Sequence, residues 1–462
     1  MASTESTYPV LDGHKVLLNY ERGTTSWPLA SYLERGGYTT AKSVLVGKKY
    51  APKELIETVK ASGLRGRGGA GFPTGLKWSF LPREPQGPIQ LVVNADESEP
   101  GTFKDRVIME ENPHVLIEGC VLSCYAIGSD SCYIYIRGEY VPAIKRMTAA
   151  VEEAYAAGHL GSDIYGSGFT CNITVHSGAG AYICGEETGL IESLEGKKGQ
   201  PRIKPPFPAV YGVFGYPTIV NNVESIAAVT YIAHAGADGY RAWGTEKSAG
   251  TKLFSVSGPV KRPGVYEVPM GYPFKDLLNN ECGGMLDGVG LKALIVGGSS
   301  VPVVTGETAL KINMDYESCA EHKTLLGSGG VIVIGEGTCM VRALMTLLRF
   351  YHHESCGQCT PCREGTGWIE RIVQRIEVGD AKPGDIDELY RIADNMELRT
   401  ICTLADAAAW PTKSFIDVFR EEFEAHIEKG CCPYDNQFPD HLNLRGGGKP
   451  QRHADPEHAF IA

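Results

Sequence analysis

Residues 64–78, LRGRGGAGFPTGLKW, form the glycine-crowded segment that constrains this chain most. Five glycines fall between positions 66 and 75, and the segment also carries three cations and two aromatic rings. Glycine lets a backbone approach a flat or phosphorylated ligand with no Cβ in the way, and free N–H groups can cradle phosphate oxygens. The segment therefore predicts a ligand-binding surface, with a flexible surface turn as the alternative that it leaves open on its own.

The glycine spacing also matches a dinucleotide-binding fingerprint, which requires a strand before it and a helix after it. Gly66, Gly68 and Gly71 have the required spacing. However, residues 52–61 upstream have helical spacing, and Pro73 prevents a helix from continuing at once. The match to an ordinary Rossmann loop is therefore weak.

The length and composition are those of a soluble globular protein. With 462 residues, 43% hydrophobic and 21% charged, the chain can form about two to four domains with real cores. A net charge of −11 argues against a nucleic-acid-binding surface. We find neither a secretory signal nor an apolar run that could span a bilayer, since Glu336 and Arg342 interrupt residues 331–350. We expect a cytosolic chain that can dock on a membrane complex but binds no nucleic acid and has no direct membrane span.

Strand and helix patterns alternate over residues 89–176. Short apolar, β-branched runs predict strands, and longer runs with helical spacing predict helices. The expected strands are residues 89–94, 132–137 and 172–176, and the expected helices are residues 113–127 and 140–156. This order predicts a parallel α/β layer.

Acidic and glycine-rich turns follow two of these strands. The first strand opens into NADESEPG at residues 94–101, and the third opens into a glycine-rich turn that ends in Glu186 and Glu187. In open α/β sheets, ligands bind beyond the carboxyl ends of the strands. These carboxylates are therefore expected to bind hydroxyls or a cationic ring edge, although the first turn alone could be a solvated acidic loop.

Residues 197–208 form a cationic, proline-rich arm. A surface linker in the polyproline conformation is one interpretation. Beside a nucleotide pocket, Lys204 would offer a phosphate contact and Phe207 a ring for stacking on a base. Asn221 and Asn222 follow, and adjacent asparagines can satisfy the donors and acceptors at the polar rim of a ligand.

The character of the sequence changes near residue 250. Residues 249–337 have short strand patterns and predict a compact β-rich α+β domain, in which no catalytic constellation stands out. Helical patterns dominate afterwards, at residues 340–351, 368–378, 386–394 and 411–429. They predict a four-helix bundle, followed by a polar tail that is expected to be loosely ordered.

Three of the 14 cysteines lie close together in the loop between the first two helices of this bundle. They follow one another at two-residue intervals, as Cys356, Cys359 and Cys362. Such thiolates can converge on one metal centre but cannot easily pair with one another. Cys402 is the best-placed fourth ligand, with Cys431 and Cys432 as competitors. Three close cysteines and a distant one fit a cubane iron–sulfur cluster, and structural zinc is the alternative.

Five motifs in this order resemble the NADH-binding flavoprotein subunit of respiratory complex I, which is its F-type subunit. They lie at residues 64–78, 94–101, 181–188, 204–208 and 355–363, and the resemblance extends over about residues 30–430. The family implies an NADH:quinone oxidoreductase that uses FMN and a 4Fe–4S cluster, with NAD(H) as substrate. Diaphorase subunits of NAD-reducing hydrogenases and NAD-dependent formate dehydrogenases are the alternative. Those relatives often carry an added cluster domain, for which this chain has no further cysteine array.

The resemblance implies a multidomain α/β and α+β fold. Its parts are a Rossmann-like FMN and NAD domain, a ubiquitin-like β-grasp domain and a C-terminal four-helix bundle with the iron–sulfur cluster. The expected divisions are an N-terminal arm at 1–50, the FMN/NADH domain at 51–248, the β-grasp domain at 249–337, the cluster-bearing bundle at 338–430 and the polar tail at 431–462.

The resemblance also assigns roles to individual residues. Those implied to hold FMN are Gly66, Arg67, Gly68, Lys77, Asn94, Asp96, Gly185, Glu186, Val220, Asn221 and Asn222. Those implied to contact NADH are Phe72, Phe80 and Phe207 near the adenine, and Glu97, Glu187 and Lys204 at its polar groups. Gly69, Ala70 and Tyr182 complete the cofactor-binding set. The implied cluster ligands are Cys356, Cys359, Cys362 and Cys402.

The implied mechanism follows from the cofactors, because NADH delivers hydride to the flavin whereas the cluster accepts electrons singly. Glu97 and Glu187 are the candidate catalytic residues, since acidic groups near the nicotinamide would disfavour negative charge on the reduced flavin. The implied partners are a thioredoxin-like 2Fe–2S subunit, a large multi-cluster iron–sulfur subunit and the rest of the peripheral arm of complex I. The implied location is the inner face of the bacterial plasma membrane, or the matrix side in a mitochondrion.

Overall fold

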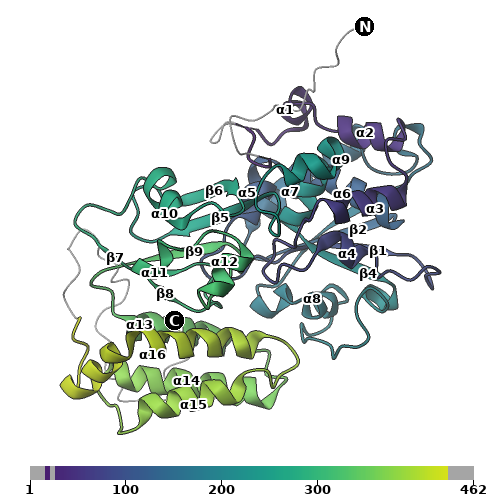
Figure 1. Ribbon diagram of the computed structural model, residues 1–462. Coiled ribbons are helices and arrows are strands. Elements are labelled where there is room, and N and C mark those ends of the chain that lie inside the picture. Colours follow the sequence, from purple (N-terminus) through teal and green to yellow (C-terminus); the bar gives the residue numbers. More distant parts are fainter. Residues whose placement is uncertain (1–15, 21–25, 435–462) are drawn as a thin grey trace.

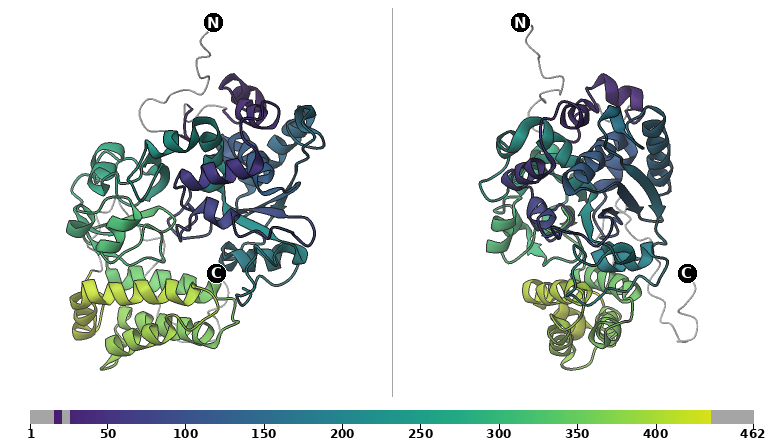
Figure 2. Two further views of the ribbon diagram at one scale, coloured as in Figure 1. Left: turned by 45° about the vertical axis from the view of Figure 1, so that its right-hand side comes forward. Right: turned by 90° about the vertical axis from the view of Figure 1, so that its right-hand side faces the viewer.

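The computed structural model describes residues 16–20 and 26–434, which form three packed parts (Figure 1). A parallel sheet with its helices lies beside a five-stranded mixed sheet, and a bundle of long helices lies below both in the view of Figure 1 (Figures 1 and 2). This is the expected combination of α/β, α+β and helical parts. The tail predicted to be loosely ordered lies outside the described residues from position 435 onward.

The first part is built on four parallel strands in the order β3-β2-β1-β4. Their bounds are β1 Gln90–Ala95, β2 Ser131–Ile136, β3 Asn172–Ser177 and β4 Thr218–Asn222. The apolar runs predicted the first three within one residue at each end. The parallel register places Asn94 opposite Asn222, so two side chains predicted to face a ligand leave the sheet at neighbouring points.

Helices enclose this sheet. They are α3 Pro52–Ala61, α4 Thr74–Trp78, α5 Asp105–Glu111, α6 Pro113–Ile127, α7 Val141–Ala156, α8 Glu187–Leu194 and α9 Val223–Arg241. Helix α6 is apolar on nearly all sides and is buried along almost its whole length, as is typical of a helix that other elements surround. It packs closely on α9, because a Cβ added at Gly119 would lie 2.3 Å from the carbonyl oxygen of Ile226.

The described portion of the predicted N-terminal arm packs on this same core. Helices α1 Leu29–Glu34 and α2 Thr39–Leu45 bury Tyr32, Tyr38 and Val44. The buried carboxylate of Glu118 on α6 accepts hydrogen bonds from the Tyr32 hydroxyl at 2.5 Å and from the backbone N–H of Tyr38 at 2.9 Å. The division of the chain at residue 50 stays a prediction.

The second part is a mixed sheet in the order β6-β5-β9-β7-β8. Its strands are β5 Thr251–Ser257, β6 Gly264–Pro269, β7 Leu291–Ile295, β8 Val304–Thr305 and β9 Gly330–Gly335. Strands β5 and β9 are parallel, whereas the other pairs are antiparallel. Short helices connect them, namely α10 Phe274–Asp276, α11 Gly306–Ala309 and α12 Tyr316–Glu321.

The third part is the predicted bundle, formed by α13 Met340–Glu354, α14 Thr360–Glu377, α15 Asp385–Met396 and α16 Leu404–Lys429. Two helices begin earlier than their sequence patterns predicted. Helix α14 begins at Thr360, with Pro361 in the first turn, where proline is tolerated. The predicted start of the last helix at residue 411 is wrong, because residues 404–409 bury an apolar face that keeps Pro411 inside the helix. Among the described residues, every helix is too short or too polar to cross a membrane.

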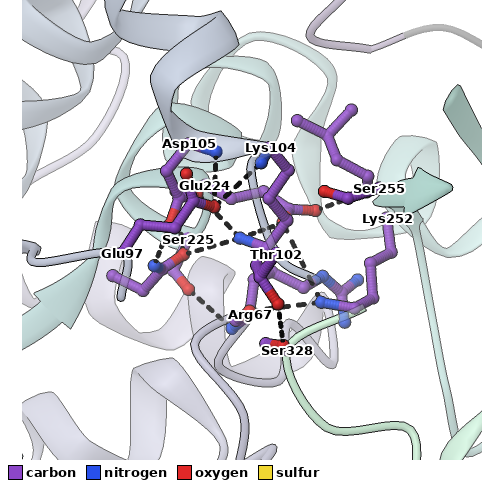
Figure 3. A network of polar contacts seen from close by, with 12 residues as sticks. Arg67, Glu97, Thr102, Lys104, Asp105, Glu224, Ser225, Lys252, Ser255 and Ser328 are labelled. Atoms are coloured by element: carbon purple, nitrogen blue, oxygen red, sulfur yellow. Dashed lines mark hydrogen bonds and ion pairs between the residues drawn. The ribbon is translucent and has the colours of Figure 1, made fainter. Parts of the chain in front are cut away.

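A buried network of charged groups joins the first two parts (Figure 3). The carboxylate of Glu224 on α9 lies 2.8 Å from Nζ of Lys104 and 3.9 Å from Nζ of Lys252 on β5. It also accepts the backbone N–H of Leu253 at 2.8 Å. Although burial opposes ionisation, Lys104, Lys252 and Arg67 hold the pKa of Glu224 below its usual range. Burial lowers the pKa of Lys252 to about 7.

Glu224→Gln is expected to lower the free energy of unfolding by about 3–5 kcal/mol at pH 7, because it removes the carboxylate paired with Lys252 and one of the two paired with Lys104. The folded-state pKa of Glu224 is depressed. Its stabilisation is therefore present above the unfolded-state pKa and is lost as the pH falls through the folded-state value, so the difference between the two proteins should shrink in acid. Chemical denaturation of both proteins at several pH values measures the effect.

Glu57→Gln is the matched control. Glu57 lies 3.6 Å from Lys60 at the surface, so losing its charge should change the free energy of unfolding by under about 0.5 kcal/mol. A Glu224→Gln effect as small as that of the control would contradict the stabilising role of the buried network.

Candidate functional site

A cavity of about 660 Å³ opens where the three parts meet. The first part supplies both glycine-rich turns and the strand exits, the second supplies residues near Ser300 and Leu326, and the bundle supplies Thr403 and Trp410. The predicted site residues in its lining are Gly68, Gly69, Ala70, Asn94, Asp96, Glu97, Tyr182, Gly185, Glu186, Asn222 and Cys402. The structure thus brings together turns that the sequence holds far apart.

The exit of strand β1 places one unsatisfied carboxylate oxygen at this cavity. Asn94 links the two strand exits, since its Nδ2 donates to the carbonyl oxygen of Gly185 at 2.8 Å. Asp96 is buried, and its Oδ1 accepts a hydrogen bond from the Ser98 hydroxyl at 3.1 Å. Its Oδ2 has no hydrogen-bond partner among the described residues. Burial raises the pKa of Asp96 to about 7. A ligand that donates a hydrogen bond would complete this group.

The glycine segment leaves room for a ligand at its backbone. Gly69 has a φ of +146°, and no described atom lies within 4 Å of where its Cβ would stand. A Cβ at Gly68 would instead lie 3.1 Å from Cβ of Asn222. Glycine is therefore needed at Gly69 for its backbone conformation and at Gly68 for close approach to β4. These features fit the backbone cradle expected of a bound flavin.

Glu97 and Glu99 have different hydrogen-bond partners. The Glu97 carboxylate accepts backbone N–H groups of Lys104 at 2.9 Å and Asp105 at 2.8 Å, at the start of α5. Burial, reinforced by Asp105, raises the pKa of Glu97 to about 7. Glu97 lines the cavity, but its contact with NADH stays a prediction. Glu99, the third carboxylate of the same predicted turn, accepts the Tyr182 hydroxyl at 2.6 Å and the N–H of Ser300 at 2.7 Å, and so joins the first two parts.

Beside the cavity, two lysines pair with the two acids of the second glycine-rich turn. Nζ of Lys77 lies 2.9 Å from Glu187, and Nζ of Lys204 lies 2.9 Å from Glu186 and 3.3 Å from Glu187. Although burial opposes ionisation, the two lysines hold the pKa of Glu187 below its usual range. Glu186 also caps α8 by accepting the backbone N–H of Thr188. The predicted polar residues of the arm and the turn therefore form one mixed-charge group.

The three predicted stacking rings lie outside the cavity lining and are largely exposed. Phe72 is 45% exposed, Phe80 53% and Phe207 58%. The ring centroids of Phe72 and Phe80 are 6.0 Å apart. Exposed aromatic rings remain free to stack on a base, and the contact of these three with adenine stays a prediction.

Four other residues predicted to hold FMN make hydrogen bonds to other groups of the protein. The Arg67 guanidinium is 1% exposed and donates to the carbonyl oxygens of Ala249 and Thr251, each at 2.9 Å. The Asn221 side chain accepts the indole N–H of Trp78, and the carbonyl oxygen of Val220 accepts Nζ of Lys77. Gly66 accepts the Tyr316 hydroxyl through its carbonyl oxygen. For these residues, contact with FMN through the main chain stays a prediction.

The loop cysteines line a second, smaller cavity next to the first. The lining includes the four predicted cluster ligands, Cys356, Cys359, Cys362 and Cys402. Ile183, Cys402 and Leu404 border both cavities. Among the described residues, these cysteines do not form a group whose ligand atoms lie within 4.8 Å of one another. A single zinc ion requires such closeness, so their wider arrangement favours a cubane over zinc.

The second part contributes to the cavity wall residues that were not predicted from the sequence. Ser300, Tyr316 and Leu326 all line the cavity. Arg65, also in the lining, lies 3.6 Å from the ring centroid of Tyr316 and 2.9 Å from Glu317. The glycine-rich runs at residues 297–298 and 327–330 were the signal that could have indicated these turns.

Asp96→Asn is expected to stabilise the flavin-free chain but weaken its binding of FMN. The folded-state pKa of Asp96 is raised to about 7, whereas its unfolded-state value is about 4. Between these two pH values the folded chain binds more protons than the unfolded chain, so the free energy of unfolding falls as the pH rises. Asparagine has no charge to bury, so the free energy of unfolding should rise by up to about 4 kcal/mol at pH 8 and by less at pH 5. Denaturation without FMN and flavin-fluorescence titration measure the two effects.

Asp238→Asn is the control, because Asp238 is exposed on α9. It should change neither the pH dependence of unfolding nor the binding of FMN. Equal flavin affinity in Asp96→Asn and the unchanged chain would contradict a hydrogen bond from FMN to Asp96.

Three segments match known protein families. Residues 59–231 match the Nuo51 FMN-binding domain, residues 253–304 the SLBB domain, and residues 342–426 the iron–sulfur binding region of NADH-ubiquinone oxidoreductase F. An F-type subunit of NADH-quinone oxidoreductase from Rhizobium meliloti is 50% identical over 406 residues, 88% of this chain and 96% of that protein. The F-type subunit from Streptomyces coelicolor is 52% identical over 410 residues, 89% of this chain and 90% of that protein.

Solved structures show the same fold. An NAD⁺-reducing NiFe hydrogenase in the air-oxidised state has a TM-score of 0.76 and 38% identity, covering 87% of this chain and 67% of that chain. Its H₂-reduced state has a TM-score of 0.77 and 37% identity, covering 92% and 71%. The curated relatives are more similar in sequence than the hydrogenase. The resemblance inferred from five motifs is confirmed: the chain belongs to the family of F-type subunits of NADH-quinone oxidoreductase, which are NADH dehydrogenase subunits with an FMN-binding domain and a 4Fe–4S region.

Proposed function

We propose that this chain oxidises NADH in the cavity between its three parts and passes the electrons on past Cys402. The observation that carries this proposal is that Cys402 and its neighbour Leu404 border both the large cavity and the cysteine-lined one. A group bound in the large cavity would therefore have a cluster ligand in its own wall. No separate path through the protein would be needed between the two centres.

When bound, FMN supplies hydride acceptance from NADH and release of electrons one at a time, which a 4Fe–4S cluster requires. The chain's own contribution is binding and orientation. We assign the support of FMN to the backbone of Gly68 and Gly69 and to the polar groups of Asn94, Asp96 and Asn222. The unpartnered Oδ2 of Asp96 and the open space at Gly69 support this assignment.

We assign NADH to the side of the cavity where the two lysines and the exposed rings lie. Lys204 would attract its phosphates, Lys77 is assigned to FMN, and Glu187, held between them, fixes both lysines in place. Phe72, Phe80 and Phe207 expose apolar ring faces on which adenine could stack. Glu97 would affect NADH binding either by positioning the start of α5 or by contacting the nucleotide directly.

We also propose that the chain assembles into the peripheral arm of a complex I. By analogy with the family, its neighbours are a thioredoxin-like 2Fe–2S subunit and a large multi-cluster iron–sulfur subunit, on the inner face of the membrane. The names of the curated relatives support the complex. The likeness to an NAD⁺-reducing hydrogenase supports the alternative, a diaphorase subunit, with lower identity.

Glu187→Gln is expected to raise the midpoint potential of bound FMN. Removing one negative charge near the flavin stabilises its electron-rich form by about 1 kcal/mol at a partly screened site, roughly 20 mV for two electrons. Redox titration of the flavin absorbance measures the shift. Glu57→Gln, a distant surface change of the same kind, should leave the potential unchanged; the same potential in both variants would argue against an electrostatic role for Glu187.

Cys402→Ser is expected to separate the two centres. It should remove most of the cluster iron and the EPR signal of the reduced cluster, while FMN remains bound and is still bleached by NADH. Metal analysis, flavin content and EPR with and without NADH test this. Cys431→Ser, which alters an exposed thiol, should behave like the unchanged chain. Retention of full iron and EPR signal in Cys402→Ser would overturn the ligand assignment.

A further inference from the structure

Four metal-ligand side chains meet inside the bundle at the end away from the cysteine loop. They come from four separate segments of the chain. We call them the far-end group: Cys339, Glu377, His426 and Cys432. Cys339 caps the start of α13, Glu377 ends α14, His426 lies in the last turn of α16, and Cys432 follows that helix. All four are buried, and their ligand atoms all lie within 4.8 Å of one another.

Three ligand atoms of the far-end group are separated by distances close to those of a tetrahedral site, and the fourth lies within 4.8 Å of each of them. Sγ of Cys339 lies 3.2 Å from Nε2 of His426 and 3.4 Å from Oε2 of Glu377, and that nitrogen and oxygen are 3.2 Å apart. Four ligands at about 2.0–2.3 Å from one zinc ion, in tetrahedral geometry, are separated by roughly 3.3–3.8 Å. The observed separations are within a few tenths of an ångström of these values.

Neighbouring groups already orient the ligand atoms toward one another. Nδ1 of His426 lies 2.6 Å from the carbonyl oxygen of Glu422, which can only accept, so Nδ1 carries a proton and Nε2 is the ring nitrogen that faces the group. Nε of Arg342 donates to Oε1 of Glu377 at 2.6 Å, which leaves Oε2 facing inward. Metal-binding histidines and carboxylates are commonly held by such outer contacts.

The backbone at the start of α13 gives the sulfur of Cys339 a hydrogen bond that a thiolate would accept, although Cys432 and burial raise the pKa of this thiol. The N–H of Arg342 donates to Sγ of Cys339 at 3.3 Å, in the N-cap position of the helix. A negatively charged sulfur is stabilised at the start of a helix, and the thiolate is the form of cysteine that binds a metal ion. Two thiolates, an imidazole and a carboxylate suit Zn²⁺ better than Mg²⁺ or Ca²⁺, which prefer oxygen ligands.

We propose that the far-end group binds one Zn²⁺ as a structural ion, separate from the iron–sulfur cluster. Helix α13 separates the two sites: its 15 residues span roughly 22 Å, with Cys339 before its start and Cys356 after its end (Figure 1). The ion would tie the segment after α16 to the first two helices of the bundle. Cys432, whose role the sequence left open, becomes one of its ligands.

The test uses the full chain with its cofactors, purified anaerobically after expression with added Zn²⁺ and iron. Metal analysis should find about one zinc per chain besides the cluster iron. Cys432→Ser should lose that zinc and melt at a lower temperature, while flavin and iron contents stay unchanged. Cys431→Ser is the matched control, because it alters the adjacent but exposed thiol and should keep the zinc.

Zinc-edge X-ray absorption on the unchanged chain tests the site even if Cys432→Ser fails to fold. It is specific to zinc, so iron and flavin do not interfere, and it should show two sulfur ligands at about 2.3 Å with nitrogen and oxygen at about 2.0 Å. Absence of zinc, zinc retained in Cys432→Ser, or a shell without sulfur would overturn the proposal. So would a Cys339–Cys432 disulfide, seen as an intact mass lower by two hydrogens.

Discussion

The carboxylate of Glu224 is the interaction on which the placement of the site depends. It lies 2.8 Å from Lys104 in the first part and accepts the N–H of Leu253 in the second. Lys252 then donates to the carbonyl oxygen of Arg67, so the glycine segment is fastened to β5 from inside the protein. Buried charges are costly unless they are paired, so pulling the two parts apart would leave charged groups buried without their partners. The glycine cradle is therefore held rigidly although its own residues have little side chain to pack.

The cavity lies where the three parts meet, and each part supplies some of its walls. The parallel sheet offers strand exits, and the second sheet and the bundle close the remaining sides. Glu99 joins the first two parts through Tyr182 and Ser300, and the N–H of Tyr182 donates to Glu354 of α13 at 2.9 Å. The buried Asp96, predicted to hold FMN, is kept at some cost in stability, which is typical of functional sites.

Local patterns predicted much of the fold and part of the site. Helix α6 and strands β1–β3 followed from periodicity, and the strand-exit rule placed Asn94 and Asp96 at the cavity. Side-chain direction could not be predicted, because it depends on distant partners: Arg67 has the sequence of a ligand-facing cation but is enclosed by the backbone of Ala249 and Thr251. The far-end group gave no pattern, since its four residues are isolated in the sequence and only the packing of helices brings them together.

Helix α13 links the walls of the large cavity to the rest of the bundle. Near its end, the Tyr351 hydroxyl lies 2.5 Å from that of Ser299, and Glu354 accepts the N–H of Tyr182, so this end is fixed to the walls of the cavity. The cysteine loop begins directly after it. Sites built on rigid elements hold their geometry better than sites on free loops. Fixing α13 at one end to the cavity and at the other to the core of the bundle would therefore hold the proposed cluster ligands in a constant position beside the large cavity, which electron transfer between the two centres would require.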